Sequence, residues 1–230
     1  MIYQLNNNII VPNKWPWGYE DSQKKYAAPV PLYYRSPLRA GTAHTIGIRA
    51  ADGAVLAVGL NSYQNVDEAR TWTDIVAVDA DFHVSAGLKS DGTVIAYGND
   101  FRNSEYNEAL SGWTDVVMIA IGTTRFLLGL KSDGTVVGTG ADEYSCVSGT
   151  SGWTDIIQIN VGEDYSLGLK SNGTVVGCGL DGDGQVSDTA TWADIVQISC
   201  GELHALGLKS DGTVVGSGAD AYSCERVTTG

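Results

Sequence analysis

The chain has 230 residues, of which 43% are hydrophobic, and its formal net charge is −13. This length supports one domain with a sizeable core or two small ones, and the apolar share argues against a disordered chain. The acidic excess repels phosphate, which argues against nucleic-acid binding through a broad basic face. Because no apolar run approaches the roughly 20 residues that cross a bilayer, we expect no membrane span.

The first 31 residues differ in composition from the rest of the chain. Residues 1–40 hold five basic and two acidic side chains, a net charge of +3, so the remaining residues carry −16. The segment "NKWPWGYE" contains Trp15, Trp17 and Tyr19. Because a segment this aromatic rarely stays loose in water, it either packs on the rest of the chain or docks on a partner. We expect residues 1–31 to form an extended arm that binds a protein partner or a neighbouring subunit.

The N-terminus also lacks a basic start followed by a long apolar stretch, so we expect no secretory signal and synthesis in the cytoplasm.

A repeat of about 40 residues follows the arm. The sequence "GLKSDGTVVG" occupies residues 129–138 and 207–216, and near copies begin at residues 47, 87 and 168. Tryptophans at 72, 113, 153 and 192 keep the same period. A fixed period of this size indicates an array architecture. The repeat domain is expected at residues 32–230, in units of about 32–71, 72–112, 113–152, 153–191 and 192–230.

The sequence of each repeat predicts β-strands. Segments such as "DIVAV" and "DIIQI" are β-branched and apolar, and "GLKS" and "TVVG" flank an Asp-Gly or Asn-Gly pair that favours a tight hairpin. A polar loop of about a dozen residues follows, and no helical periodicity appears. Since the strands are apolar on both faces, each unit needs a neighbour on both sides. The sequence therefore predicts an all-β chain, a β-propeller of about five short three- to four-stranded blades with an extended N-terminal arm.

One repeat carries a family resemblance. The sequence "GWTDIIQINVGEDYSLGLKSNGTVVGCGLDGDGQVS" resembles a repeat of the regulator of chromosome condensation family, in its compact bacterial-type form. It is also similar to the short repeat of propeller-type β-lactamase inhibitors. The resemblance covers roughly residues 32–230 and implies a propeller, typically seven-bladed, whereas this chain has five units. Exchange activity on a small GTPase belongs to the eukaryotic branch, whose insertion loop has no match here.

The aspartates that could suggest catalysis or metal binding are better explained as turn residues. Asp91, Asp133 and Asp211 occupy hairpin turns, and Asn172 replaces them in one repeat, which an acid–base pair would not tolerate. The acidic turn "DGDGQ" at 181–185 lacks the third oxygen ligand and the distal Glu of a calcium loop. We therefore expect no catalytic residue, no metal, no cofactor and no enzyme activity.

The histidines and cysteines are expected to pack. His44 and His204 share a slot that other repeats fill with Val, Phe or Tyr, which is typical of a packing position. The four cysteines form no metal-binding pattern and are expected to be reduced and buried. A pairing of Cys178 with Cys200 across adjacent blades stays open.

The loops carry the remaining candidates. Tyr63, Tyr144 and Tyr222 each follow an anchor glycine by ten residues. They either form a recognition rim, because tyrosine is favoured at interfaces, or pack each loop onto its own blade. The partner-binding candidates are Trp15, Trp17, Tyr19, Tyr63, Tyr144, Tyr222, Asp142, Glu143 and Asp220.

These features favour a non-enzymatic protein-binding or scaffold propeller, such as an attachment or decoration component of a phage particle, located in a virion or at a cell surface. That assembly role rests on fold-level analogy. The alternative is a regulatory protein, an inhibitor or exchange-factor-like chain, that covers a partner's active site. An enzyme with its site at the propeller mouth is a third class, for which the sequence offers no nucleophile–base or metal constellation.

Overall fold

The structure is a computed structural model that describes residues 37–49, 52–99 and 104–219. The predicted arm at residues 1–31 lies outside these ranges. Fifteen strands form five antiparallel sheets of three consecutive strands each. We number the sheets as blades 1 to 5: β1 (Leu38–Ala40), β2 (His44–Ile48) and β3 (Val55–Gly59); β4 (Ile75–Asp81), β5 (Val84–Lys89) and β6 (Val94–Gly98); β7 (Val116–Gly122), β8 (Phe126–Lys131) and β9 (Val136–Gly140); β10 (Ile156–Val161), β11 (Tyr165–Lys170) and β12 (Val175–Gly179); β13 (Ile195–Cys200), β14 (His204–Lys209) and β15 (Val214–Gly218).

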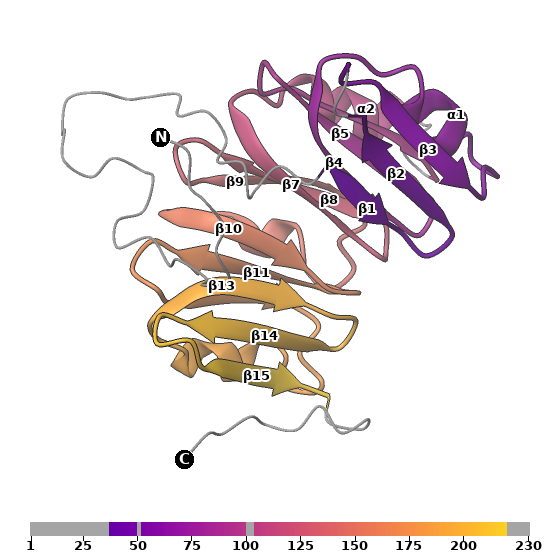
Figure 1. Ribbon diagram of the computed structural model, residues 1–230. Coiled ribbons are helices and arrows are strands. Elements are labelled where there is room, and N and C mark those ends of the chain that lie inside the picture. The colour runs from indigo at the N-terminus through magenta and orange to yellow at the C-terminus, as the bar shows by residue number, and fades with distance from the viewer. Residues whose placement is uncertain (1–36, 50–51, 100–103, 220–230) are drawn as a thin grey trace, which may run out of the picture.

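The blades follow one another along an arc (Figure 1). Extensive contacts between strands of different blades join only blades that are consecutive in the chain. Blade 1 and blade 5 lie at opposite ends of the arc (Figure 1). The predicted all-β class and the five blades are confirmed, with three strands in each blade.

The hydrophobic core is divided into layers between consecutive blades. We call the side of a blade that contacts the following blade its forward face, and the opposite side its rear face. In the layer between blades 4 and 5, the forward face of blade 4 supplies Tyr165, Leu167 and Leu169. The rear face of blade 5 supplies Trp192 and Ile198. The other three layers follow the same plan, in which apolar strand residues of one blade pack against the tryptophan and apolar strand residues of the next. Each blade is therefore stabilised through its neighbours, as the two-sided apolar strands predict.

Each tryptophan at the start of a repeat covers a glycine in the middle strand of its own blade. A Cβ atom on Gly168 would lie 2.8 Å from the ring of Trp153, and one on Gly207 would lie 2.8 Å from Trp192. Any larger residue at these positions would displace the indole ring. This packing explains why glycine interrupts the apolar "LGLK" strands.

The hairpins also connect neighbouring blades. Asp133 Oδ1 accepts hydrogen bonds from the backbone nitrogen and the hydroxyl of Thr135, at 3.0 and 2.6 Å, which lower the pKa of Asp133. Gly134 adopts a φ of 82°, and its carbonyl accepts a hydrogen bond from Ile156 N of the next blade at 3.0 Å. Asn172 makes the same two contacts with Thr174. The aspartate or asparagine of each hairpin therefore stabilises its turn, as expected from the sequence.

The connecting loops differ from expectation because they contain short helices. These are α1 (Asn65–Ala69), α2 (Ser104–Ser111), η2 (Ser148–Thr150) and η3 (Ser187–Thr191). Three of them have five residues or fewer, which is too short for a helical period to appear in the sequence. The eight residues of α2 make slightly more than two turns, and Leu110 anchors it in the core. Within the described ranges, no helix has the length and apolarity to span a membrane.

Candidate functional site

Three loops give the structure its best-defined candidate binding surface. We call residues 60–71, 141–152 and 180–191 the rim loops; each connects the outer strand of one blade to the tryptophan of the next. Their helices contact both blades: α1 packs on β3 and on β5 and β6, and η2 packs on β9 and β12. The rim loops therefore cover the outer edges of three of the four blade–blade junctions.

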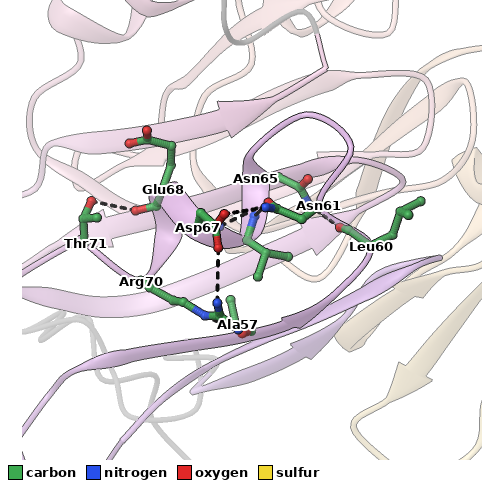
Figure 2. Close-up of polar contacts among 9 residues, drawn as sticks. Ala57, Leu60, Asn61, Asn65, Asp67, Glu68, Arg70 and Thr71 are labelled. Atoms are coloured by element: carbon green, nitrogen blue, oxygen red, sulfur yellow. Dashed lines mark hydrogen bonds and ion pairs between the residues drawn. The ribbon is translucent and has the colours of Figure 1, made fainter.

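The first rim loop is organised by Asn61 (Figure 2). Its side-chain oxygen accepts hydrogen bonds from the backbone nitrogens of Val66 and Asp67, at 2.9 and 3.2 Å, and its amide donates to the Asp67 carboxylate at 2.7 Å. Gln64, just before α1, has a left-handed φ of 61°. Asn61 thus satisfies the donors at the start of α1 in place of the residue next to the helix.

Arg70 fixes the other end of this loop (Figure 2). Its Nε donates to the carbonyl of Ala57 on β3 at 2.9 Å, and its Nη1 lies 3.2 Å from Asp67. The hydroxyl of Thr71 donates to the Glu68 carbonyl at 2.7 Å. Because β3 is the outer strand of its sheet, the hydrogen bond from Arg70 satisfies a backbone carbonyl that would otherwise remain unpaired at an open sheet edge.

The other two rim loops repeat the Asn61 arrangement with aspartate. Asp142 accepts backbone hydrogen bonds from Val147 and Ser148 at 2.7 and 3.1 Å. Asp181 accepts them from Val186 and Ser187 at 2.9 and 3.0 Å. Partial burial favours the neutral acid, but these hydrogen bonds outweigh it and lower the pKa of both carboxyls.

Asp142, predicted as a partner-binding residue, therefore holds the loop in shape. Asp181 does the same in the "DGDGQ" segment, which forms an acidic turn as expected. Within the described ranges, no three His, Cys, Asp or Glu side chains form a group suited to a metal ion.

The tyrosines of the rim loops have different environments. Tyr63 is half-buried, and its ring centroid lies 5.0 Å from that of His83 in the following blade. Tyr144 is 47% exposed, and the neighbouring Glu143 is also exposed. The structure therefore separates the two sequence interpretations: Tyr63 packs on the next blade, whereas Tyr144 faces solvent. Trp15, Trp17, Tyr19, Asp220 and Tyr222 lie outside the described residues.

Sequence reasoning missed a polar connection through the first strands of three blades. Asp79 on β4 lies 3.2 Å from Arg39 of blade 1 and accepts a hydrogen bond from Ile121 N of blade 3 at 2.8 Å. Burial raises the pKa of Asp79 to about 6, although Arg39 and the backbone donors oppose this shift. Arg39, Asp79 and Ile121 are one repeat apart, and this spacing is the signal that could have revealed them.

The histidine slot is a packing position. His44 is buried, its Nε2 lies 2.9 Å from the hydroxyl of Ser85 in blade 2, and burial lowers its pKa. Tyr165 fills the same slot in blade 4, and its hydroxyl donates to the carbonyls of Gly201 and His204. The slot therefore connects a blade to its successor through hydrogen bonds as well as apolar contact.

Cys146, Cys178 and Cys200 are free thiols in the structure. Cys178 lies beside Cys146 in the layer between blades 3 and 4, whereas Cys200 lies in the next layer. The disulfide between Cys178 and Cys200, which the sequence left as an open question, is therefore not formed. Burial raises the pKa of Cys146 to about 11 and those of Cys178 and Cys200 to about 12, so these thiols are poor nucleophiles at neutral pH.

Comparisons with known proteins agree with this architecture. The regulator of chromosome condensation (RCC1) repeat matches residues 156–185 and 195–224. No curated protein matches the sequence.

Three solved structures illustrate the structural likeness. Yeast RCC1 (Prp20), solved with Kap60 bound, is 20% identical with a TM-score of 0.63, and the match covers 79% of this chain and 55% of that one. The ectodomain of the Physcomitrella patens receptor kinase CR4 is 19% identical with a TM-score of 0.63, covering 80% and 53%. Human WBSCR16 is 17% identical with a TM-score of 0.61, covering 77% and 60%.

The match thus spans little more than half the length of each of these proteins. At these identities the structural likeness establishes the fold alone, and the repeat match covers the last two of the five units. The five three-stranded blades, the repeated Trp–Gly packing and these comparisons together show that the chain has the RCC1-like propeller fold and that two of its five units match the RCC1 repeat.

Proposed function

We propose that this chain is a non-enzymatic protein-binding propeller that serves as a scaffold or attachment component of a larger assembly. The observation that carries the proposal is the second rim loop, residues 141–152. There Asp142 fixes the backbone, while Tyr144 and Glu143 extend into solvent. A tyrosine on a rigid loop provides contact area with little loss of conformational entropy on binding, as in many protein interfaces.

The arm and the rim would share the attachment. Residues 1–40 are basic and the rest of the chain is strongly acidic. A partner that meets both regions therefore needs an acidic patch for the arm and an apolar or basic pocket for Tyr144 and Glu143. In this proposal the chain is made in the cytoplasm and acts in a virion or at a cell surface, without metal or cofactor.

The solved relatives provide an analogy for protein binding. Yeast RCC1 (Prp20) was solved with Kap60 bound to it, and the CR4 propeller forms part of a receptor ectodomain. One of these structures thus contains a bound protein, and the other is the ectodomain of a receptor kinase. The identities are too low to transfer either partner to this chain.

The proposal is tested by purifying the tagged chain from its source cells and particles and quantifying associated proteins by mass spectrometry. We expect Tyr144→Ala to reduce the recovery of a specific partner at least about tenfold, the loss of one interface hot spot. Ser90→Ala, at an exposed hairpin turn, is the matched control and should leave recovery unchanged. Equal recovery with both variants would show that the rim does not bind the partner.

Addition of a chelator separates the no-metal part of the proposal from the binding part. We expect partner recovery and the melting temperature to stay unchanged in its presence. A loss of either property would contradict a metal-free scaffold.

A further inference from the structure

The forward face of blade 5 has the composition of an interface. By strand register, its residues correspond one by one to those with which blade 4 contacts blade 5. The corresponding pairs are Ile157 and Val196, Gln158 and Gln197, Tyr165 and His204, Leu167 and Leu206, Leu169 and Leu208, and Val175 and Val214.

The environments of the paired residues differ sharply. Leu167 is fully buried, whereas Leu206 is 43% exposed. Gln158 is buried and makes two hydrogen bonds to the main chain of Ile198 in blade 5, at 2.9 and 3.0 Å. Gln197 has the same position in blade 5 and is exposed. Blade 5 thus carries both the apolar surface and the amide that blade 4 uses to bind its successor.

The rear face of blade 1 is the complementary half. Leu38 has the strand register of Ile198, and Leu56 has that of Val215. Ile198 is buried against blade 4, and Val215 is half-buried there. Leu38 and Leu56 are instead 65% and 52% exposed.

The hairpin glycines of blades 2 to 5, whose turns are one residue shorter than that of blade 1, support the same conclusion. A Cβ atom on Gly53 of blade 1 would meet nothing within 4 Å although blade 2 follows it. A Cβ atom on Gly92, Gly134 or Gly173 would lie 3.1 to 3.3 Å from the backbone of the next blade. A Cβ atom on Gly212, the equivalent residue of blade 5, would meet nothing within 4 Å. The turn of blade 5 therefore has the shape that fits a following blade, but lies in open space.

We propose that the forward face of blade 5 binds the rear face of blade 1 of a second copy of this chain, in the register in which blade 4 binds blade 5. The second copy is favoured because one chain carries both matching halves of the interface. These halves lie at opposite ends of the arc and point to a contact between chains (Figure 1). Such a head-to-tail contact can extend into a ring or a filament. This inference is independent of the proposed rim interface.

The test is sedimentation velocity over a range of concentrations, with one substitution on each face. Leu206→Glu places a charge on blade 5, and Leu56→Glu places one on blade 1. Ser210→Glu adds the same charge at an exposed hairpin turn of blade 5 and serves as the control. Circular dichroism and thermal melting under dilute conditions check that every variant is folded.

We expect the wild type and Ser210→Glu to form dimers and larger species as concentration rises, and each leucine variant alone to stay monomeric. An equimolar mixture of the two leucine variants should form a dimer and stop there. Leu206→Glu keeps an intact blade 1, Leu56→Glu keeps an intact blade 5, and only one competent contact remains between them.

Three results would overturn the proposal. One is a wild type that remains monomeric at all concentrations, and another is a mixture of variants that does not dimerise. The third is a dilute, monomeric Leu206→Glu variant that melts well below Ser210→Glu, because a segment of the same chain, such as residues 1–36, would then cover the face.

Discussion

Leu167 and Leu206 occupy the same position in consecutive blades, yet one is fully buried and the other is 43% exposed. The local sequences are nearly identical, "SLGLK" and "ALGLK", so the difference arises from the presence or absence of a following blade. The repeat therefore encodes an interface rather than a self-sufficient unit. In such arrays, stability is the sum of contributions from each unit and from each nearest-neighbour contact.

The largest expected effect separates these two leucines. Leu167→Ala should lower the free energy of unfolding by about 2–5 kcal/mol, because it leaves a cavity in a closed layer. Leu206→Ala should lower it by less than about 1 kcal/mol in dilute solution, because the side chain already contacts water. Chemical denaturation of both variants measures the difference. Equal losses would mean that the end face is covered within the monomer.

The second prediction compares two hairpin glycines with nearly the same backbone. Gly134 and Gly212 have φ values of 82° and 88°, so valine strains both turns by about 1–2 kcal/mol. Gly134→Val should cost more, since its Cβ would also lie 3.3 Å from the backbone of Asp155 in the next blade. Lys131→Ala, in the same hairpin, is the mild control. Thermal melting should rank Gly134→Val lowest, and an inverted order of the two glycine variants would contradict the account.

The third prediction compares the side-chain amides of Gln158 and Gln197, which occupy the same position in blades 4 and 5. Gln158→Ala should destabilise the chain by about 1–3 kcal/mol, because it leaves the buried backbone nitrogen and carbonyl of Ile198 without their partner. Gln197→Ala should stay within about 0.5 kcal/mol of the wild type in dilute solution. Urea titrations of the two variants provide the comparison. A large effect of Gln197→Ala in the monomer would show that its amide has a partner within the chain.

The fourth prediction concerns pH at the connection among blades 1, 2 and 3. The pKa of Asp79 rises from 3.8 to about 6 in the folded chain, so folding favours its protonated form and its ionisation opposes folding. The contribution of Asp79 to the free energy of unfolding should fall by on the order of 1–3 kcal/mol as pH rises from about 4 to about 6. Asp79→Asn should remove this contribution.

The measurement is the free energy of unfolding of the wild type minus that of Asp79→Asn at several pH values. This difference should decrease with rising pH over the stated range. An increase would indicate that the ion pair with Arg39 dominates over the burial of Asp79.

The sequence was sufficient to predict the blades because their determinants are local. Asp-Gly and Asn-Gly pairs set the hairpins, the five hairpin copies gave the number of units, and the tryptophans confirmed the period. The shared histidine slot was also correctly predicted to be a packing position, since residues as different as Val84 and Tyr165 fill it.

The loops were less predictable because their order depends on contacts across several residues. Asn61, Asp142 and Asp181 have the same role, but the change from amide to acid and the different loop sequences hide the equivalence. Asp142 was predicted to bind a partner, although its carboxylate accepts backbone hydrogen bonds within the loop. The connection of Arg39 to Asp79 joins separate blades and becomes evident only once they are stacked.

The central claim is that blades 1 and 5 each expose one half of a blade–blade interface. Hydrogen exchange measured by mass spectrometry, on dilute and concentrated wild-type protein, tests it most directly. In dilute solution, β8 and β11 should be strongly protected, whereas β3 and β15 should exchange faster. In concentrated solution, protection should rise in β3 and β15 and stay constant in β8. Equal protection of all five blades in dilute solution, or no change on concentration, would contradict the account.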